Sequence, residues 1–181
     1  MAQTVLVVGG SRSGKSAYAQ ALAETESGVL YYLATCPCPL QSDDPEMSAR
    51  ILAHQQKRQG GLWQTIEEPL HLADFLQTLP TQATVLIDCL TLWISNLMYA
   101  DRAGTLDEEQ VAALAQELLA AARTRPGEVI IVSSEVGCGL VPEQALSRRF
   151  RDFVGRCNQV MAAGADRVVQ VVCGIPVTIK G

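Results

Sequence analysis

Short apolar runs alternate along the chain with longer segments in which apolar residues recur every three or four positions. The run TVLVVGG at 4–10 is rich in β-branched residues and ends in glycine, and VLYYLAT at 29–35 has the same character. Continuous runs of this kind are typical of strands covered on both faces. Further strands are predicted within 84–93, where the strand ends at Asp88, within 128–137, and in the terminal segment 166–180.

The segments between these runs carry helical signals. LDEEQVAALAQELLAAAR at 106–123 has acidic residues first and an arginine late, which suits the helix dipole. Asp44 before Pro45 is typical of a helix start, and that helix is expected to end near Gly60 and Gly61. Strands alternating with helices predict an α/β fold with a mainly parallel sheet and right-handed crossovers. With no internal repeat or linker, residues 1–181 are expected to form a single domain. The other predicted helices are 13–26 and 146–165.

Composition narrows the classes of function. The net charge is −5 and no long Lys/Arg run occurs, so we expect no nucleic-acid partner held by bulk electrostatics. No apolar run approaches the roughly 20 residues of a membrane span, and the N-terminus has no basic leader, so a cytoplasmic protein is expected. Cys36 and Cys38 form a C-P-C pair. Without a second ligand pair at zinc-like spacing, loop thiols are favoured over a metal site.

The strongest motif is GGSRSGKS at 9–16, which fits G-x-x-x-x-G-K-[ST] directly after a predicted strand and before a predicted helix. Gly9 and Gly14 permit backbone geometry in which successive N–H groups point at phosphate oxygens. The helix that follows adds its positive end. Lys15 is expected to reach the β- and γ-phosphates of a nucleoside triphosphate, and Ser16 to ligate Mg²⁺. The alternative, a glycine turn that happens to carry a lysine, is disfavoured by the flanking strand and helix.

Asp88 ends a predicted buried strand, where P-loop proteins carry a second carboxylate that holds Mg²⁺ or its water. We favour this metal or nucleotide role. The competing interpretation is a helix-capping aspartate, because Thr91 and an apolar run follow.

His54 lies in EMSARILAHQQKR at 46–58, one helical turn from Arg50 and from Arg58. Neutral imidazole is a competent nucleophile toward phosphorus, and the two arginines are suited to hold the triphosphate under attack. A solvated histidine on a basic helix face accounts for the same pattern. Spacing alone leaves both interpretations open.

The chain resembles the bifunctional adenosylcobinamide kinase/adenosylcobinamide-phosphate guanylyltransferase family of cobalamin biosynthesis. Matching blocks cover nearly the whole chain in the family's order. The P-loop is shared by many proteins, whereas R-I-x-x-H, E-V-G-x-G-x-V-P and F-R-D-x-x-G-x-x-N-Q are far more specific. The blocks are GGSRSGKS, YLAT, EMSARILAHQQKR with WQTIEEP, LIDCLTLWISNL, EVGCGLVPE, FRDFVGRCNQ and GIPVTIK.

The resemblance implies a P-loop NTPase-like fold and two activities. ATP or GTP first donates its γ-phosphoryl group to the aminopropanol hydroxyl of adenosylcobinamide. The family's histidine, which matches His54, then attacks the α-phosphorus of GTP and passes GMP to adenosylcobinamide phosphate. Family members are typically homotrimers, so a homo-oligomer is expected. The competing hypotheses are a P-loop small-molecule kinase in which His54 is incidental, and a nucleotide-binding module without turnover.

The resemblance also assigns site residues by position. Two departures from the family pattern affect the loops: Ser134 stands where asparagine is expected, and Cys36 where serine is common. Glu67 has a competing interpretation as a surface acid beside Glu68, and His71 is expected on the surface. Lys15 and His54 are the implied catalytic residues, Ser16 and Asp88 the implied metal ligands. The implied nucleotide contacts are Gly9, Gly10, Ser11, Arg12, Ser13, Gly14, Lys15, Ser16, Ala34, Thr35, Cys36, Gln55, Gln56, Lys57, Arg58, Glu67 and Asp88.

Overall fold

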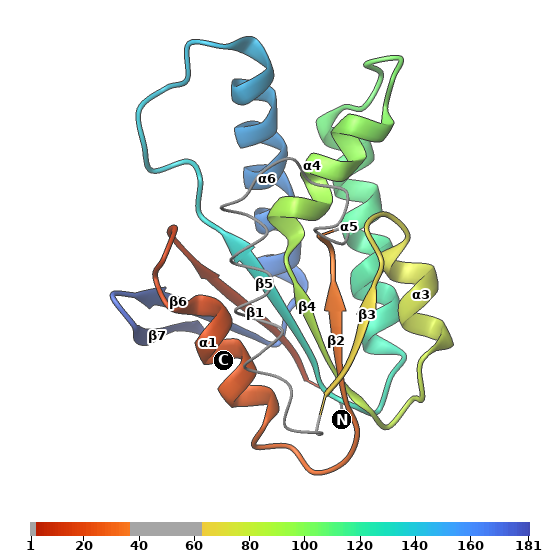
Figure 1. The fold of residues 1–181 in the computed structure, drawn as a ribbon. Helices are drawn as coiled ribbons and strands as arrows, with labels where there is room; N and C mark the ends of the chain where they lie inside the picture. Colours follow the sequence, from red (N-terminus) through yellow and green to blue (C-terminus); the bar gives the residue numbers. More distant parts are fainter. Residues whose placement is uncertain (1–2, 37–62) are drawn as a thin grey trace.

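The structure, a computed structural model, describes residues 3–36 and 63–181. Within these residues seven strands form one sheet in the order β3-β2-β4-β5-β1-β6-β7 (Figure 1). All neighbouring pairs are parallel except β6 and β7. The strands are β1 (Thr4–Gly9), β2 (Leu30–Ala34), β3 (Trp63–Glu67), β4 (Thr84–Asp88), β5 (Val129–Ser134), β6 (Arg167–Val172) and β7 (Ile175–Lys180).

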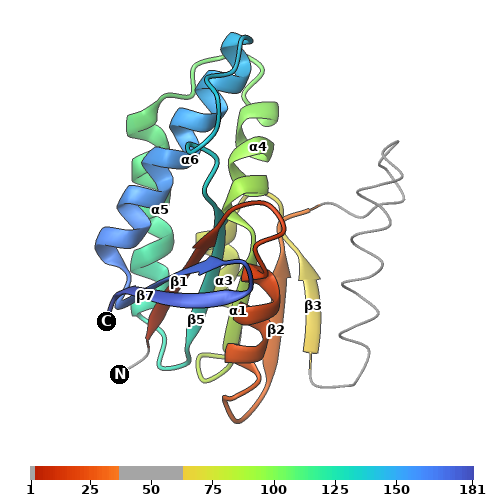
Figure 2. The ribbon, with the colours of Figure 1, turned by 90° about the vertical axis from the view of Figure 1, so that its left-hand side faces the viewer.

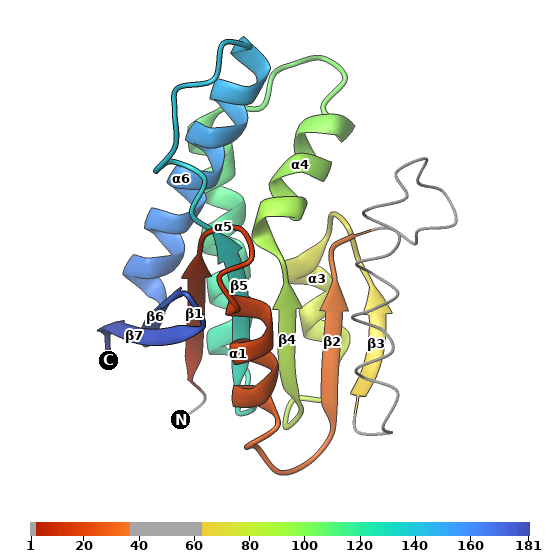
Figure 3. The ribbon, with the colours of Figure 1, turned by 60° about the vertical axis from the view of Figure 1, so that its left-hand side comes forward.

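Helices cover both faces of this sheet. Helix α1 lies on one face, and the other described helices lie on the opposite face (Figures 2 and 3). Helix α5 begins with a capping box: the Asp107 side chain accepts from the Gln110 backbone N–H, and the Gln110 side chain accepts from the Asp107 backbone N–H. The helices are α1 (Lys15–Ala23), α3 (Leu72–Thr78), α4 (Leu90–Ala100), α5 (Glu108–Arg123) and α6 (Ala145–Gly164).

The predicted α/β fold with a mainly parallel sheet is confirmed, and each predicted strand is present. Strand β3 and the helices α3 and α4 were not predicted from the sequence. Strand β3, at the sheet edge, has partly exposed and mostly polar residues, and α3 is short, so neither gives a strong apolar period. His71 is exposed before α3, as predicted. The helix predicted from Asp44 lies outside the described residues.

Alternate residues of the central strands pack on opposite faces. In β5, Val129 and Ile131 join the core beneath α3, α4, α5 and α6, whereas Ile130 and Val132 join the core beneath α1. Strands buried on both faces explain the continuous apolar runs. Among the helices of the described residues, none combines the length and apolar character that a bilayer crossing requires.

Arg125 joins three parts of this fold from the end of α5. Its side chain is only 4% exposed. Its guanidinium donates to the carbonyl oxygens of Leu76 (2.7 Å), Leu79 (3.1 Å), Pro80 (2.7 Å) and Ala83 (3.3 Å). These carbonyls end α3 and lead into β4, so one buried side chain binds four acceptors of the chain reversal. The Pro80 carbonyl oxygen also accepts from the Ala83 N–H.

Replacing Arg125 with methionine keeps apolar bulk but removes these donors. We expect the free energy of unfolding to fall by about 2–4 kcal/mol, because several buried carbonyls lose their partners. Urea denaturation measures the change. Arg123→Met is the matched control: Arg123 is exposed and donates to the Gly164 oxygen, so its loss is expected to cost less than about 1 kcal/mol. Equal losses in the two variants would contradict this role for Arg125.

Candidate nucleotide-phosphate site

The P-loop, residues 9–16, connects β1 to α1 with two residues in left-handed backbone conformation. Arg12 has φ of 56° and Gly14 has φ of 93°, and Gly14 is the N-cap of α1. Positive φ values within such a loop are typical of the backbone conformations whose N–H groups bind anions. Gly14 carries no Cβ to oppose its positive φ.

Gly9 is required for another reason, which is close packing. A Cβ built on Gly9 would lie 2.5 Å from the Ser13 Oγ and 2.7 Å from the Val171 carbonyl oxygen of β6. The loop is also supported from behind, because the Gly174 N–H in the β6–β7 turn donates to the Ser13 carbonyl oxygen (2.8 Å). The Ser13 hydroxyl is buried and has no hydrogen-bond partner among the described residues.

Lys15 opens α1 and folds back over the loop. Its Nζ donates to the Gly10 carbonyl oxygen at 3.1 Å, so the ammonium lies above the loop rather than extending away from it. A cation held over the loop at the start of a helix is suited to bind the β- and γ-phosphates of a nucleotide.

Asp88 ends β4, with β5 between it and the P-loop strand. Its Oδ2 accepts a hydrogen bond from the Tyr32 hydroxyl at 2.9 Å. The capping interpretation is not what the structure shows: the N-cap of α4 is Cys89, and its side chain makes no capping hydrogen bond among the described residues. Burial, and then the neighbouring Asp88 carboxylate, raise the pKa of Cys89 to about 12. The Cys89 thiol is therefore neutral and a poor nucleophile.

Thr35, a predicted nucleotide contact, is buried at the end of β2 and ties β2 to the start of α4. Its Oγ1 donates to the Cys89 carbonyl oxygen and accepts from the Cys89 N–H, both at 2.8 Å. Asn96 Nδ2 donates to the Thr35 carbonyl oxygen at 2.7 Å. The Thr35 side chain is thus committed to protein contacts, and any direct nucleotide contact stays a prediction.

The other predicted contacts at this end of the sheet are partly accessible. Ala34 and Cys36 are half-buried, and Glu67 is exposed at the end of β3. Burial, and then the Glu67 carboxylate, raise the pKa of Cys36, which places these two side chains near one another. Strand order puts this group on the far side of Asp88 from the P-loop. His54, Gln55, Gln56, Lys57 and Arg58 lie outside the described residues, as does Cys38.

The donor types at the P-loop and β4 fit Mg²⁺. Ser16 contributes a hydroxyl and Asp88 a carboxylate, and both lie at the carboxyl edge of the sheet. Within residues 3–36 and 63–181, no group of three or more His, Cys, Asp or Glu is arranged to hold a metal ion. A Mg²⁺ ion here would therefore take its remaining ligands from nucleotide phosphates and water, which is its usual habit.

A cluster of polar side chains at this edge, in addition to the P-loop and Asp88, was not assigned a role from the sequence. It joins Ser133 and Glu135 on the β5 side to Asn158 on α6. The motifs E-V-G-x-G-x-V-P and F-R-D-x-x-G-x-x-N-Q contain Glu135 and Asn158. The presence of both motifs could have indicated a functional role for Glu135 and Asn158. Their separation in the sequence gave no sign that the two side chains are in contact.

Comparison with solved structures agrees with the P-loop fold. An ATPase from a bacterial type III secretion system matches with a TM-score of 0.56 and 12% identity, over 93% of this chain and 50% of that one. A DnaB-like replicative helicase matches with a TM-score of 0.52 and 13% identity, over 93% of this chain and 46% of that one. The chain spans about half the length of each. At these identities the likeness shows the fold alone, which is that of P-loop NTPases.

Two curated proteins are similar over nearly their whole length. "Bifunctional adenosylcobalamin biosynthesis protein CobU" of Escherichia coli is 42% identical, over 97% of this chain and 99% of its own. "Bifunctional adenosylcobalamin biosynthesis protein CobP" of Pseudomonas aeruginosa is 41% identical, over 97% of this chain and 96% of its own. A family model described as cobinamide kinase / cobinamide phosphate guanyltransferase matches residues 5–179. The chain therefore belongs to the cobinamide kinase / cobinamide phosphate guanyltransferase family.

Proposed function

We propose that this protein catalyses two successive steps of cobalamin biosynthesis. In the first, ATP or GTP phosphorylates the aminopropanol hydroxyl of adenosylcobinamide. In the second, GMP passes from GTP through His54 to adenosylcobinamide phosphate, giving adenosylcobinamide-GDP and pyrophosphate. The observation that carries the proposal is the P-loop with Lys15 folded over it, in a chain that matches the bifunctional family along almost its whole length.

The first step needs little covalent chemistry from the protein. The P-loop amides and Lys15 neutralise and orient the triphosphate, which supplies most of what phosphoryl transfer requires. Ser16 and Asp88 would hold Mg²⁺, which neutralises charge on the phosphates when bound.

The second step needs a nucleophile. The His54 imidazole attacks the α-phosphorus, the bond from that phosphorus to the bridging oxygen breaks, and pyrophosphate leaves with the electron pair. The acceptor's phosphate oxygen then attacks the same phosphorus and displaces the imidazole. A covalent intermediate divides one difficult transfer into two displacements. This role of His54, and the nucleotide contacts of Gln55, Gln56, Lys57 and Arg58, are supported by the family match of the R-I-x-x-H segment.

We further propose a homotrimer located in the cytoplasm. Support for the oligomer comes from the family resemblance and from strand β7 at the sheet edge, which exposes the apolar side chains of Ile175, Val177 and Ile179. Exposed apolar groups of this kind often mark protein interfaces.

The histidine can be tested by labelling. With GTP labelled at the α-phosphate and Mg²⁺, the wild-type protein is expected to retain acid-labile label after denaturation, because a phosphoramidate is hydrolysed by acid. His54→Ala is expected to retain none. His71→Ala is the matched control, since His71 is the other histidine of the chain and is exposed; it should label like the wild type. Absence of label in wild-type protein that binds GTP would refute the guanylyl-histidine step.

The role of Asp88 can be tested through the Mg²⁺ dependence of phosphorylation. Asp88→Asn keeps an acceptor for the Tyr32 hydroxyl but removes the charge, so the Mg²⁺ concentration for half-maximal rate is expected to rise about tenfold or more. Asp152→Asn, a half-exposed carboxylate 3.8 Å from Arg151, removes the same charge elsewhere and should leave the curve unchanged. An unshifted curve in Asp88→Asn would argue against metal binding by this residue.

A further inference from the structure

Glu135 follows β5, the strand between the P-loop strand β1 and the Asp88 strand β4. Ser134 is paired with Gly9 in the β1–β5 register, and the Glu135 N–H donates to the Gly9 carbonyl oxygen at 3.0 Å. Its backbone is therefore fixed to the first residue of the P-loop. Glu135 is half-buried and lies at the edge where the triphosphate is expected.

The Glu135 carboxylate is held by one buried side chain. Asn158 of α6, only 7% exposed, donates through Nδ2 to Glu135 Oε1 and to the Ser134 carbonyl oxygen, both at 3.1 Å. The Asn158 Oδ1 accepts from the buried Ser133 hydroxyl at 2.6 Å. The Ser134 carbonyl oxygen can only accept, so its bond to Nδ2 fixes the amide with its NH₂ group toward Glu135. Buried and satisfied, Asn158 is a rigid support for the carboxylate.

Glu135 and Asp88 lie on opposite sides of the sheet. Asp88 contacts Tyr32, which belongs to the core on the α1 side. Glu135 contacts α6, and the next residue, Val136, packs against the core on the α6 side. The α1 side of the sheet thus carries the groups that are suited to hold the phosphates and the cation: Lys15, Ser16 and Asp88. Glu135 presents a carboxylate from the other.

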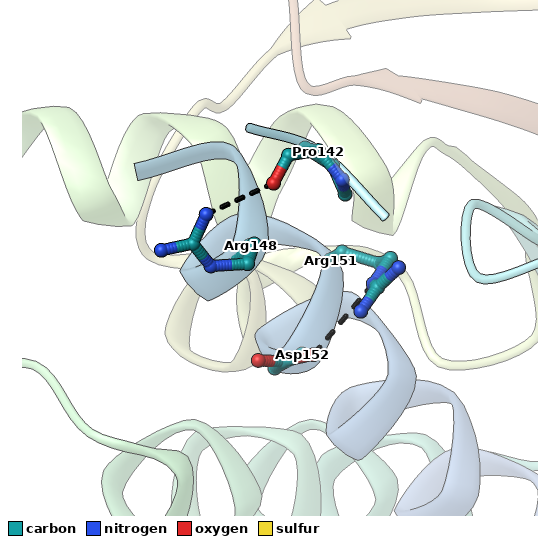
Figure 4. A network of polar contacts seen from close by, with 4 residues as sticks. All are labelled: Pro142, Arg148, Arg151 and Asp152. Atoms are coloured by element: carbon teal, nitrogen blue, oxygen red, sulfur yellow. Dashed lines mark hydrogen bonds and ion pairs between the residues drawn. The ribbon is translucent and has the colours of Figure 1, made fainter. Parts of the chain in front are cut away.

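The chain beyond Glu135 is anchored at its far end to α6. Arg148 donates to the Pro142 carbonyl oxygen (2.9 Å), and Arg151 and Asp152 are paired one turn further along the helix (Figure 4). Arg148 also donates to the Glu143 carbonyl oxygen (2.6 Å). The segment 135–144 is therefore attached to α6 through Asn158 at one end and through Arg148 at the other. These attachments keep Glu135 on the α6 side of the edge.

We propose that Glu135 is the general base of the phosphorylation step and that Asn158 is its positioning residue. The acceptor hydroxyl gives its proton to the Glu135 carboxylate as its oxygen bonds to the γ-phosphorus. The bond from that phosphorus to the β–γ bridging oxygen breaks, and the nucleoside diphosphate leaves with the electron pair. Glu135 later returns the proton to water. The aspartate that accepts the substrate proton in protein kinases has the same chemical role.

The inference rests on the proposed kinase activity, and the experiment separates the two. Phosphorylation of adenosylcobinamide by ATP and guanylyl transfer to supplied adenosylcobinamide phosphate are measured on the same preparations. In Glu135→Gln we expect the kcat of phosphorylation to fall roughly 100-fold or more, the usual contribution of a general base. Nucleotide affinity and guanylyl transfer should stay within a few-fold, because neutral imidazole needs no base to attack phosphorus. Glu143→Gln, an exposed carboxylate nearby, is the charge-matched control and should behave as the wild type.

Two further measurements separate a base from a merely structural carboxylate. In Glu135→Ala, added formate should restore part of the phosphorylation rate, whereas it should not in Glu135→Gln. Asn158→Ala should lower kcat in the wild-type background but have little further effect in Glu135→Gln, because a positioning residue acts only through the group it positions. Additive losses from the two changes would overturn the role of Asn158.

Other results would contradict either the general-base role of Glu135 or the proposed kinase activity itself. Phosphorylation that survives Glu135→Gln, or a parallel loss of nucleotide affinity and of both activities, would overturn the proposal for Glu135. A wild-type protein that binds ATP but transfers no phosphoryl group would instead overturn the proposed kinase function, and with it the inference. If Glu135→Gln fails to fold, formate rescue of Glu135→Ala and the kcat of Asn158→Ala test the proposal instead. If Glu135→Ala and Asn158→Ala also fail to fold, a structural role replaces the proposed one.

Discussion

The parallel pairing of β1 with β5 and of β5 with β4 is the constraint on which the candidate site depends. These two registers bring the carboxyl ends of three strands to one edge, and each end carries a different polar group. The P-loop leaves β1, Glu135 follows β5, and Asp88 ends β4. Ligands of open α/β sheets bind at this edge because loops there diverge while the strands remain fixed. Packing of the apolar strand interiors therefore determines the spacing of the chemical groups.

The alternation of side chains along each strand then divides these groups between two sides. The α1 side carries a cation, a hydroxyl and a carboxylate, which match the charges of a metal–triphosphate complex. The α6 side carries a carboxylate supported by a buried amide. A carboxylate close to a triphosphate is repelled by it, so such a group is useful only where it interacts with something other than phosphate. This physical argument favours proton acceptance over nucleotide binding for Glu135.

The sequence predicted the P-loop and every described strand except β3, because these are local signals. A buried parallel strand is a continuous apolar run, and a phosphate loop needs glycines and a lysine at fixed spacing. What it could not predict was contact between distant segments. Asn158 lies 23 residues from Glu135, and a half-buried glutamate near the end of a strand has no local pattern. Strand β3 was missed because an edge strand with polar residues lacks the apolar run. Arg125 had no signal either, since its four acceptors are backbone carbonyls.

The stereochemistry of displacement at phosphorus connects the two proposed reactions. In the proposed guanylyl transfer, His54 attacks the α-phosphorus from the side opposite the leaving pyrophosphate. The acceptor then attacks from the side opposite His54, which is the side that pyrophosphate has left. The acceptor's phosphate thus enters where the β-phosphate had been. If one P-loop serves both steps, it first positions the γ-phosphoryl group for transfer to adenosylcobinamide. The same loop can then bind that group as the phosphate of the acceptor. One P-loop can serve both reactions in this way because its backbone amides and Lys15 bind a phosphate group whichever molecule carries it.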